Sequence, residues 1–185
     1  MIKSYAPAEF LFQRLRIRQV ERHIPVGGVL VDIGCDCDQT LIKRMAMKMK
    51  KCIGIDIAVS ARKSGNVEIL QQDIQKKIDL PSNTANAITI LAVLEHMKHP
   101  KDIIAECHRI LKKDGVLLIT VPSAAGRPIL ELFALVGIVR KEMIEQHENY
   151  FTKDQLRALC QRAGFRKVDV RSFEFGYNTF VKATK

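Results

Sequence analysis

The chain alternates short apolar runs with segments in which apolar residues recur at helical spacing. Runs rich in Val and Ile, typical of buried strands, are followed by polar turns and then by amphipathic stretches. Strands are predicted at 29–33, 52–56, 67–70, 87–92 and 116–121. Helices are predicted at 7–24 and 41–51, as a short segment at 60–64, from Pro100 to a terminus at Lys112-Lys113 and Gly115, and from Thr152 to Gly164.

Two further strand-like runs, 167–173 and 177–182, flank a short turn that contains Gly176 and predict a C-terminal β-hairpin. Because parallel neighbours need crossover connections, strands that alternate with helices indicate an α/β fold with helices on both faces of the sheet. The hairpin adds an antiparallel strand, so we expect seven strands in a mostly parallel sheet. At 185 residues, 1–185 should form a single domain, with an N-terminal helical segment at 1–25.

Acidic residues stand at the carboxyl ends of the first three predicted strands. Asp32 and Gly34 close the first strand, and Asp38 or Thr40 is a candidate N-cap for the helix that follows. Asp56 closes the second strand, about 20 residues beyond the glycine turn, where a carboxylate can accept both hydroxyl protons of a ribose. Asp73 follows the third. This spacing predicts a nucleoside-binding sheet.

Several short motifs occur in the order and spacing of a known family. They begin with Val31-Asp32-Ile33-Gly34-Cys35, Gly54-Ile55-Asp56 and Gln72-Asp73-Ile74, and continue with Leu91-Ala92-Val93-Leu94-Glu95-His96, Arg109-Ile110-Leu111 and His147-Glu148-Asn149-Tyr150-Phe151-Thr152. In these motifs residues 25–185 resemble the class I S-adenosylmethionine-dependent methyltransferases, in particular the type 11 group of small-molecule enzymes. The resemblance implies a Rossmann-like fold.

The resemblance also implies roles for individual residues. Asp56 would hold the ribose hydroxyls and Asp73 the adenine amine, and Ile57 and Ile74 would line the adenine slot. The methionine end of S-adenosylmethionine would lie beside Asp32, Gly34, Cys35 and Ala92.

Two residues depart from the family pattern in the turn after the first strand. Asp36 and Asp38 stand where the family has glycines, and an aspartate adds both a side chain and a negative charge. Aspartate tolerates left-handed backbone better than most residues, so the turn can form. A catalytically impaired methyltransferase-like binding or scaffold protein is therefore the alternative to an active enzyme.

Methyl transfer to an acceptor that carries a proton requires a group to take that proton. His96 and His147 are the candidates, both at positions where the family has the edge of its active site, and a structural role is open for each. No metal site is expected: the Glu95-to-His99 segment lacks the His-Glu-x-x-His order of a zinc site, and the Asp36 and Asp38 pair lies on a single loop.

Residues 123–150 occupy the place where this family builds its acceptor lid. A largely apolar stretch, 128–139, precedes Arg140-Lys141, which would suit a hydrophobic or lipid-linked small-molecule acceptor and association with a membrane surface. A core helix or a homodimer contact is the alternative, so the chain is expected to be a monomer or a homodimer.

The composition of the chain limits the classes of partner and the cellular compartment that we expect. The net charge is +10, but the 30 basic residues are spread along the chain without interleaved aromatic side chains, so a nucleic-acid substrate is the less favoured alternative. No apolar run reaches the roughly 18 residues of a membrane span, and the five cysteines fit reduced thiols. The expected location is cytoplasmic.

Overall fold

The computed structural model describes residues 7–75, 77–123 and 151–185, and these residues contain one eight-stranded sheet with the order β3-β4-β2-β1-β5-β6-β8-β7. The five neighbouring strands β4-β2-β1-β5-β6 are parallel to one another. Strand β3 is antiparallel to β4, and β8 is antiparallel to both β6 and β7. The strands are β1 (Val29–Ile33), β2 (Lys51–Asp56), β3 (Arg62–Ser64), β4 (Val67–Gln71), β5 (Ala85–Leu91), β6 (Leu111–Pro122), β7 (Lys167–Phe173) and β8 (Asn178–Thr184).

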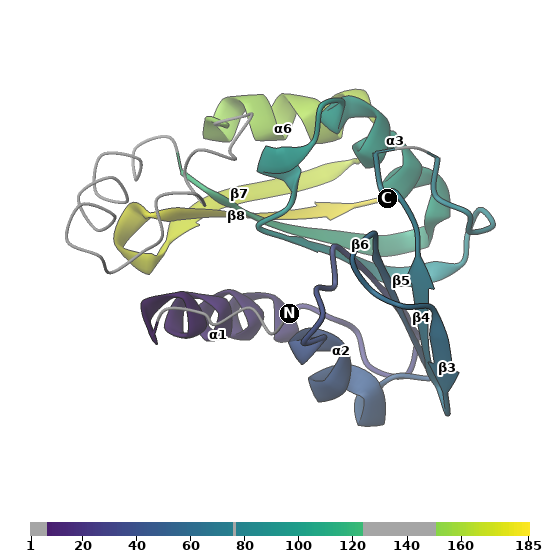
Figure 1. Cartoon of the computed structure of the whole chain (residues 1–185). Helices are drawn as coiled ribbons and strands as arrows, with labels where there is room; N and C mark the ends of the chain where they lie inside the picture. The colour runs from purple at the N-terminus through teal and green to yellow at the C-terminus, as the bar shows by residue number, and fades with distance from the viewer. Residues whose placement is uncertain (1–6, 76, 124–150) are drawn as a thin grey trace.

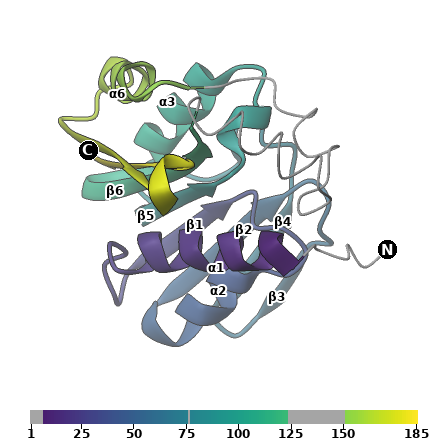
Figure 2. The same ribbon diagram turned by 90° about the vertical axis from the view of Figure 1, so that its left-hand side faces the viewer.

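Helices cover both faces of the sheet. Figure 1 shows α3 and α6 on one face and α1 and α2 on the other. In Figure 2, α1 lies across the front of the face that it shares with α2. The α-helices are α1 (Pro7–Glu21), α2 (Thr40–Met45), α3 (Pro100–Ile110) and α6 (Lys153–Arg162). The short 3-10 helices are η1 (Ala46–Lys48), η2 (Leu94–His96) and η4 (Glu174–Gly176).

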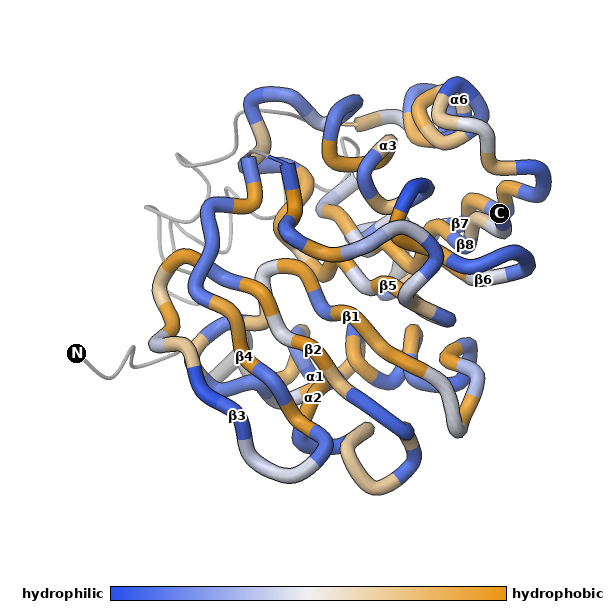
Figure 3. The backbone as a smooth tube through the Cα atoms, turned by 90° about the vertical axis from the view of Figure 1, so that its right-hand side faces the viewer, coloured by the Kyte–Doolittle hydropathy of each residue, from blue (hydrophilic) through white to orange (hydrophobic). Residues whose placement is uncertain are grey.

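Alternation along the strands divides the apolar core between these two faces. Ile88 and Ile90 of β5 pack in the cluster that contains residues of α3 and α6, whereas Ala87 packs in the cluster of α1 and α2. The parallel strands are hydrophobic along most of their length and the connecting loops are largely hydrophilic (Figure 3). This is the arrangement expected for a parallel sheet buried on both sides.

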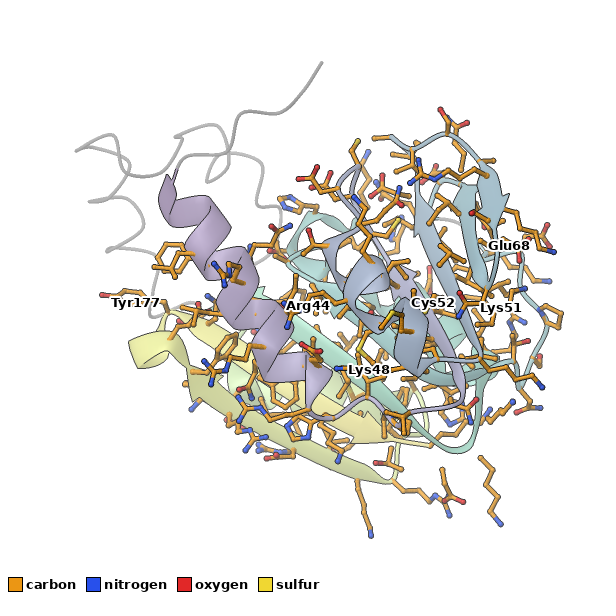
Figure 4. The ribbon with its side chains drawn as sticks, turned by 90° about the horizontal axis from the view of Figure 1, so that it is seen from below. Arg44, Lys48, Lys51, Cys52, Glu68 and Tyr177 are labelled. Carbon is orange, nitrogen blue, oxygen red and sulfur yellow. The ribbon has the colours of Figure 1, made fainter. Side chains whose placement is uncertain are left out.

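Ion pairs fasten the N-terminal helix to the layer beneath it. Glu21 at the end of α1 accepts from Arg44 of α2 at 2.6 Å and from Lys48 of η1 at 2.8 Å, and Figure 4 shows both basic side chains beside α1. Ile17 and Val20 of α1 are buried against the sheet. Helix α1 is therefore an integral part of this face.

The predicted α/β fold is confirmed, with a difference in the number of strands. The short helix predicted at 60–64 is wrong, because Arg62–Ser64 form the edge strand β3. Gly65, with φ +55°, turns the chain back so that β3 pairs with β4. All three β3 residues are exposed, so this strand lacks the buried alternate positions that reveal a strand in sequence.

Two predicted helix boundaries are also wrong. The helix predicted at 41–51 ends at Met45, and after η1 the backbone is extended at Met49. The helix predicted to end at Lys112-Lys113 and Gly115 stops at Ile110, and β6 begins directly at Leu111. Gly115 serves close packing: a Cβ there would lie 2.8 Å from the Lys112 carbonyl oxygen.

The C-terminal predictions are confirmed. Thr152 and Gln155 form a reciprocal capping box at the start of α6, and Gly164, with φ +101°, follows its end. Strands β7 and β8 form the expected hairpin, and β8 joins it to β6. No helix within the described residues is long and apolar enough to span a bilayer.

Candidate active site

A buried acid lies at the carboxyl end of β1. Asp32 shares the α1 and α2 face with Leu30, is 4% exposed, and is level with Thr89 on β5. The Thr89 hydroxyl donates to Asp32 Oδ1 at 2.5 Å. Burial raises the pKa of Asp32 to about 7 against the opposing effect of this hydrogen bond, and the Asp56 charge raises it further.

Two separate features of the turn after β1 require glycine at position 34. The φ of Gly34 is +74°, and a Cβ built on it would lie 2.4 Å from Cγ2 of Val93 in the loop after β5. Its N–H donates to the carbonyl of Ile55 on β2 at 2.8 Å. The turn is thus in contact with both neighbouring strand ends, and Cys35 beside it is buried.

Asp56 ties this turn to the end of β2. Its Oδ2 accepts the N–H of Asp36 at 3.1 Å, and its Oδ1 accepts the N–H of Ala58 at 2.8 Å. A carboxylate oxygen has two lone-pair sites, so each oxygen retains acceptor capacity for a ligand hydroxyl. Asp56 is half-buried, so part of its side chain is accessible to a ligand.

The two aspartates that replace family glycines differ in their environment. Asp36 has φ +55°, in the left-handed region expected for a glycine, and its Oδ1 accepts the N–H of Cys37 at 2.7 Å. Asp38 is exposed. The predicted N-cap at Asp38 or Thr40 is wrong: Gln39, with φ +49°, takes that position, and its side chain accepts from Arg62 of β3.

The predicted adenine-side residues lie beyond β2 and β4. Asp73 is half-buried and its Oδ1 accepts the N–H of Gln75 at 3.0 Å in a turn. Ile57 is 60% exposed beside Asp56, whereas Ile74 is 9% exposed and packs in the core cluster of α3 and α6. Of the two isoleucines, Ile57 offers the more accessible apolar surface.

The loop after β5 contains the remaining predicted residues. Ala92 has φ +54°, and its N–H donates to Thr120 of β6 at 2.8 Å. His96 is half-buried in η2. His147 lies outside the described residues, as do residues 124–150 of the predicted lid.

Sequence reasoning overlooked Glu95, which precedes His96. Its side chain is 2% exposed, and Oε2 has no hydrogen-bond partner among the residues that the structure describes. Burial raises the pKa of Glu95 to about 7, partly offset by the positive charge of Arg16 on α1. Its only sequence signal is an acid directly after the apolar residues that follow β5.

A second acid, the half-buried Glu174 of η4, lies near the same arginine. Burial raises the pKa of Glu174, while a hydrogen bond from Asn178 and the charge of Arg16 lower it. Within residues 7–75, 77–123 and 151–185, its Oε1 lacks a hydrogen-bond partner, as does the hydroxyl of Thr120 near the end of β6. Helix α1 therefore places a cation close to two carboxylates from elements that are far apart in the sequence.

The carboxyl edge of the sheet thus combines a glycine turn, a half-buried carboxylate and buried acids. Among the described residues, no three His, Cys, Asp or Glu side chains are grouped so as to hold a metal ion. A family model described as a methyltransferase domain matches residues 5–170.

The chain belongs to the methyltransferase-domain family. This membership confirms the predicted family, the reaction class and S-adenosylmethionine as the cofactor. Among relatives of this methyltransferase, a ubiquinone biosynthesis O-methyltransferase of Nitrosococcus oceani is 21% identical over 166 residues, covering 81% of this chain and 69% of the relative. A ubiquinone/menaquinone biosynthesis C-methyltransferase of Ectopseudomonas mendocina is 25% identical over 168 residues, covering 82% of this chain and 60% of the relative.

Solved structures agree with this methyltransferase fold. An S-adenosylmethionine-dependent methyltransferase of Mesorhizobium loti superposes with a TM-score of 0.71 at 14% identity, covering 91% of this chain and 96% of that one. Another of Archaeoglobus fulgidus gives a TM-score of 0.68 at 16% identity, covering 96% and 99%. At such identities the likeness concerns the fold alone.

Proposed function

We propose that this methyltransferase moves a methyl group from S-adenosylmethionine to a small, apolar, ring-containing acceptor at the carboxyl edge of its sheet. The observation that carries the proposal is the half-buried carboxylate of Asp56, which accepts the N–H of Asp36 in the turn that follows Gly34. The names of the relatives, which include ubiquinone biosynthesis O-methyltransferases, support an acceptor with a quinone-like ring.

The residues at this edge fit the nucleoside and methionine parts of the cofactor. Asp56 can accept from ribose hydroxyls with its remaining lone pairs, and exposed Ile57 provides apolar surface beside it. Asp36 adopts the left-handed backbone of the glycine it replaces, and its carboxylate accepts from the neighbouring Cys37. This conformation favours an active enzyme over the scaffold alternative.

When bound, S-adenosylmethionine supplies a methyl group already activated by a sulfonium. The protein then has to align the acceptor with that methyl group, to exclude water and to receive any proton the acceptor loses. We assign the last role to Glu95, because it is buried, no described residue forms a hydrogen bond with its Oε2, and burial raises its pKa to about 7. His96 and His147 stay predictions for the same role.

Calorimetric titration with S-adenosylhomocysteine tests the cofactor site. Replacing Asp56 with Asn keeps its shape but removes its charge and one acceptor oxygen, so affinity should fall roughly 10- to 100-fold, the usual worth of a hydrogen bond to a charged group. The matched control is Asp79→Asn, an exposed aspartate beyond β4, which should leave affinity unchanged. Equal affinities for wild type and Asp56→Asn would remove Asp56 from the site.

Assays with simple catechols and hydroquinones test the acceptor class. Methyl transfer to such rings in preference to amines of similar size is the expected result. Glu95→Gln should lower the rate at neutral pH and remove a pH-dependent step near pH 7, while cofactor affinity stays unchanged. An unchanged pH profile would contradict the role given to Glu95.

A further inference from the structure

A second groove lies at the opposite edge of the sheet, where the parallel strands begin. It has a volume of about 700 Å³ and is bounded by the starts of β1, β2 and β4 and by the turn between β3 and β4. At roughly 3.3 Å per residue, the five residues of β1 separate this groove from the turn at Gly34 by about 16 Å. A ligand here is distinct from the cofactor and the acceptor.

Positive charge dominates this groove, which we call the lysine groove. Its lining includes four lysines and one acidic residue, Glu68, so its formal charge is +4 − 1 = +3; the lysines are Lys50, Lys51, Lys63 and Lys112. Lys51 Nζ lies 2.6 Å from Glu68 Oε2, and Figure 4 shows the two side chains beside each other. The Lys51 hydrogen bond, with the nearby Lys51 and Lys63 charges, lowers the pKa of Glu68.

The remaining ammonium groups of the lysine groove form no ion pair among the described residues, although the Lys63 charge acts on Glu68 across the β3–β4 pair. Lys50 and Lys63 are exposed, and within the part of the chain that the structure describes neither lies within 4.0 Å of a carboxylate. Lys112 Nζ donates to the neutral side chain of Asn86 at 3.5 Å and forms no ion pair with any described residue. Three lysines are therefore available to a ligand while the fold stays intact.

Side-chain amides hold the walls of the lysine groove in place. Asn86 Oδ1 accepts the N–H of Val29 at 3.0 Å, and a Cβ at Gly28 would lie 2.6 Å from Asn86 Cγ. Asn66 donates to the carbonyls of Ala46 and Met49 at 2.7 and 2.8 Å. These bonds hold the two amide side chains in place, so the cationic groups that can select a ligand are the lysines.

The chemistry of the lining defines the ligand class. Lysine acts as a compact charge with rotatable donors, which suits phosphate oxygens without demanding one planar geometry. The lining contains no aromatic side chain on which a base could stack. We propose that the lysine groove binds a compact polyanion with at least two linked phosphate groups, separately from the methyl-transfer site.

Titration with tripolyphosphate, pyrophosphate and phosphate tests this site. Affinity should rise with phosphate number and fall with salt, and Lys50→Gln combined with Lys63→Gln should weaken tripolyphosphate binding at least about tenfold, since two of the three available charges are lost. The control combines Lys43→Gln with Lys98→Gln, two exposed lysines outside the groove that remove the same charge. It should change affinity less than about twofold.

Several outcomes would overturn the proposal. Equal losses in the two double variants would mean that only net charge matters, and absence of binding at millimolar tripolyphosphate would remove the site. A short single-stranded RNA bound more tightly than tripolyphosphate would assign the groove to a nucleic acid instead. S-adenosylhomocysteine affinity, measured in parallel, should be the same in all variants, so a failure of the lysine groove leaves the proposed function untouched.

Discussion

The two edges of the sheet differ in the sign of their charge and in how that charge is held. At the carboxyl edge, Asp32 and Glu95 are almost completely buried, and burial raises the pKa of each to about 7. At the amino edge, Lys50 and Lys63 are exposed and surrounded by solvent. Because the two acids are buried, their interactions should depend on the shape of their surroundings and on pH. The interactions of the two exposed lysines should depend mainly on ionic strength.

The largest expected difference between the edges concerns two glycines with positive φ. Gly34→Ala should destabilise the fold by about 4 kcal/mol and abolish S-adenosylhomocysteine binding, because left-handed strain adds to a collision with Val93. Gly65 at the amino edge also has a positive φ, of +55°, but a Cβ there would have no atom within 4 Å. Gly65→Ala should therefore lower the free energy of unfolding by only about 1 kcal/mol. Urea unfolding of both variants measures the contrast; similar losses would show that crowding at Gly34 is relieved elsewhere.

A smaller effect should come from ionising Asp32. Its folded pKa of about 7 exceeds the 3.8 that is ordinary for an aspartate, so the folded state binds more protons between about pH 4 and pH 7, and stability falls as pH rises through that window. Asp32→Asn keeps an acceptor for Thr89 and removes this loss. Relative to wild type, the variant should gain about 3 kcal/mol between pH 4.5 and pH 8.

Urea unfolding at several pH values checks this gain for Asp32. Asp79→Asn, which removes a charge from an exposed position, is the control and should run parallel to wild type. A constant difference between Asp32→Asn and wild type across the pH range would mean that Asp32 does not titrate as its burial implies.

The smallest effect is expected at the amino edge. The Lys51 to Glu68 ion pair is partly exposed, with side-chain exposures of 40% and 28%, so Glu68→Gln should cost no more than about 0.5 kcal/mol. The same change frees Lys51 and should strengthen tripolyphosphate binding about twofold to fivefold. Weaker binding in this variant would show that Glu68 positions Lys51 for the ligand.

The sequence predicted the parts of the fold that follow hydrophobic periodicity. Five strands and the capped helix α6 were recognisable, because the spacing of their apolar residues matches the face that each element buries. The strands are β1, β2, β4, β5 and the centre of β6. Strand β3 was missed since it is exposed and depends on β4 and on Arg62 reaching Gln39. The end of α2 at Met45 was also missed, because the chain passes through η1 and an extended Met49 to reach the start of β2 at Lys51.

The site residues that could be predicted from the sequence are those whose location follows from their place at the end of a strand. Asp32, Gly34 and Asp56 lie where strand ends meet at one edge of the sheet, as their spacing indicated. The grouping of Glu95 and Glu174 around Arg16 was not predictable, because residues from α1, η2 and η4 meet only in the folded chain. The lysine groove was hidden for the same reason.

The hydrogen bond from the Asp36 N–H to Asp56 has a thermodynamic consequence. Because Asp56 already accepts main-chain groups from Asp36 and Ala58, the backbone of this turn is ordered before any ligand arrives. Binding should therefore carry little unfavourable conformational entropy from the turn, since pre-organisation lowers the entropic cost of association. The temperature dependence of the binding enthalpy should then reflect buried surface rather than local folding.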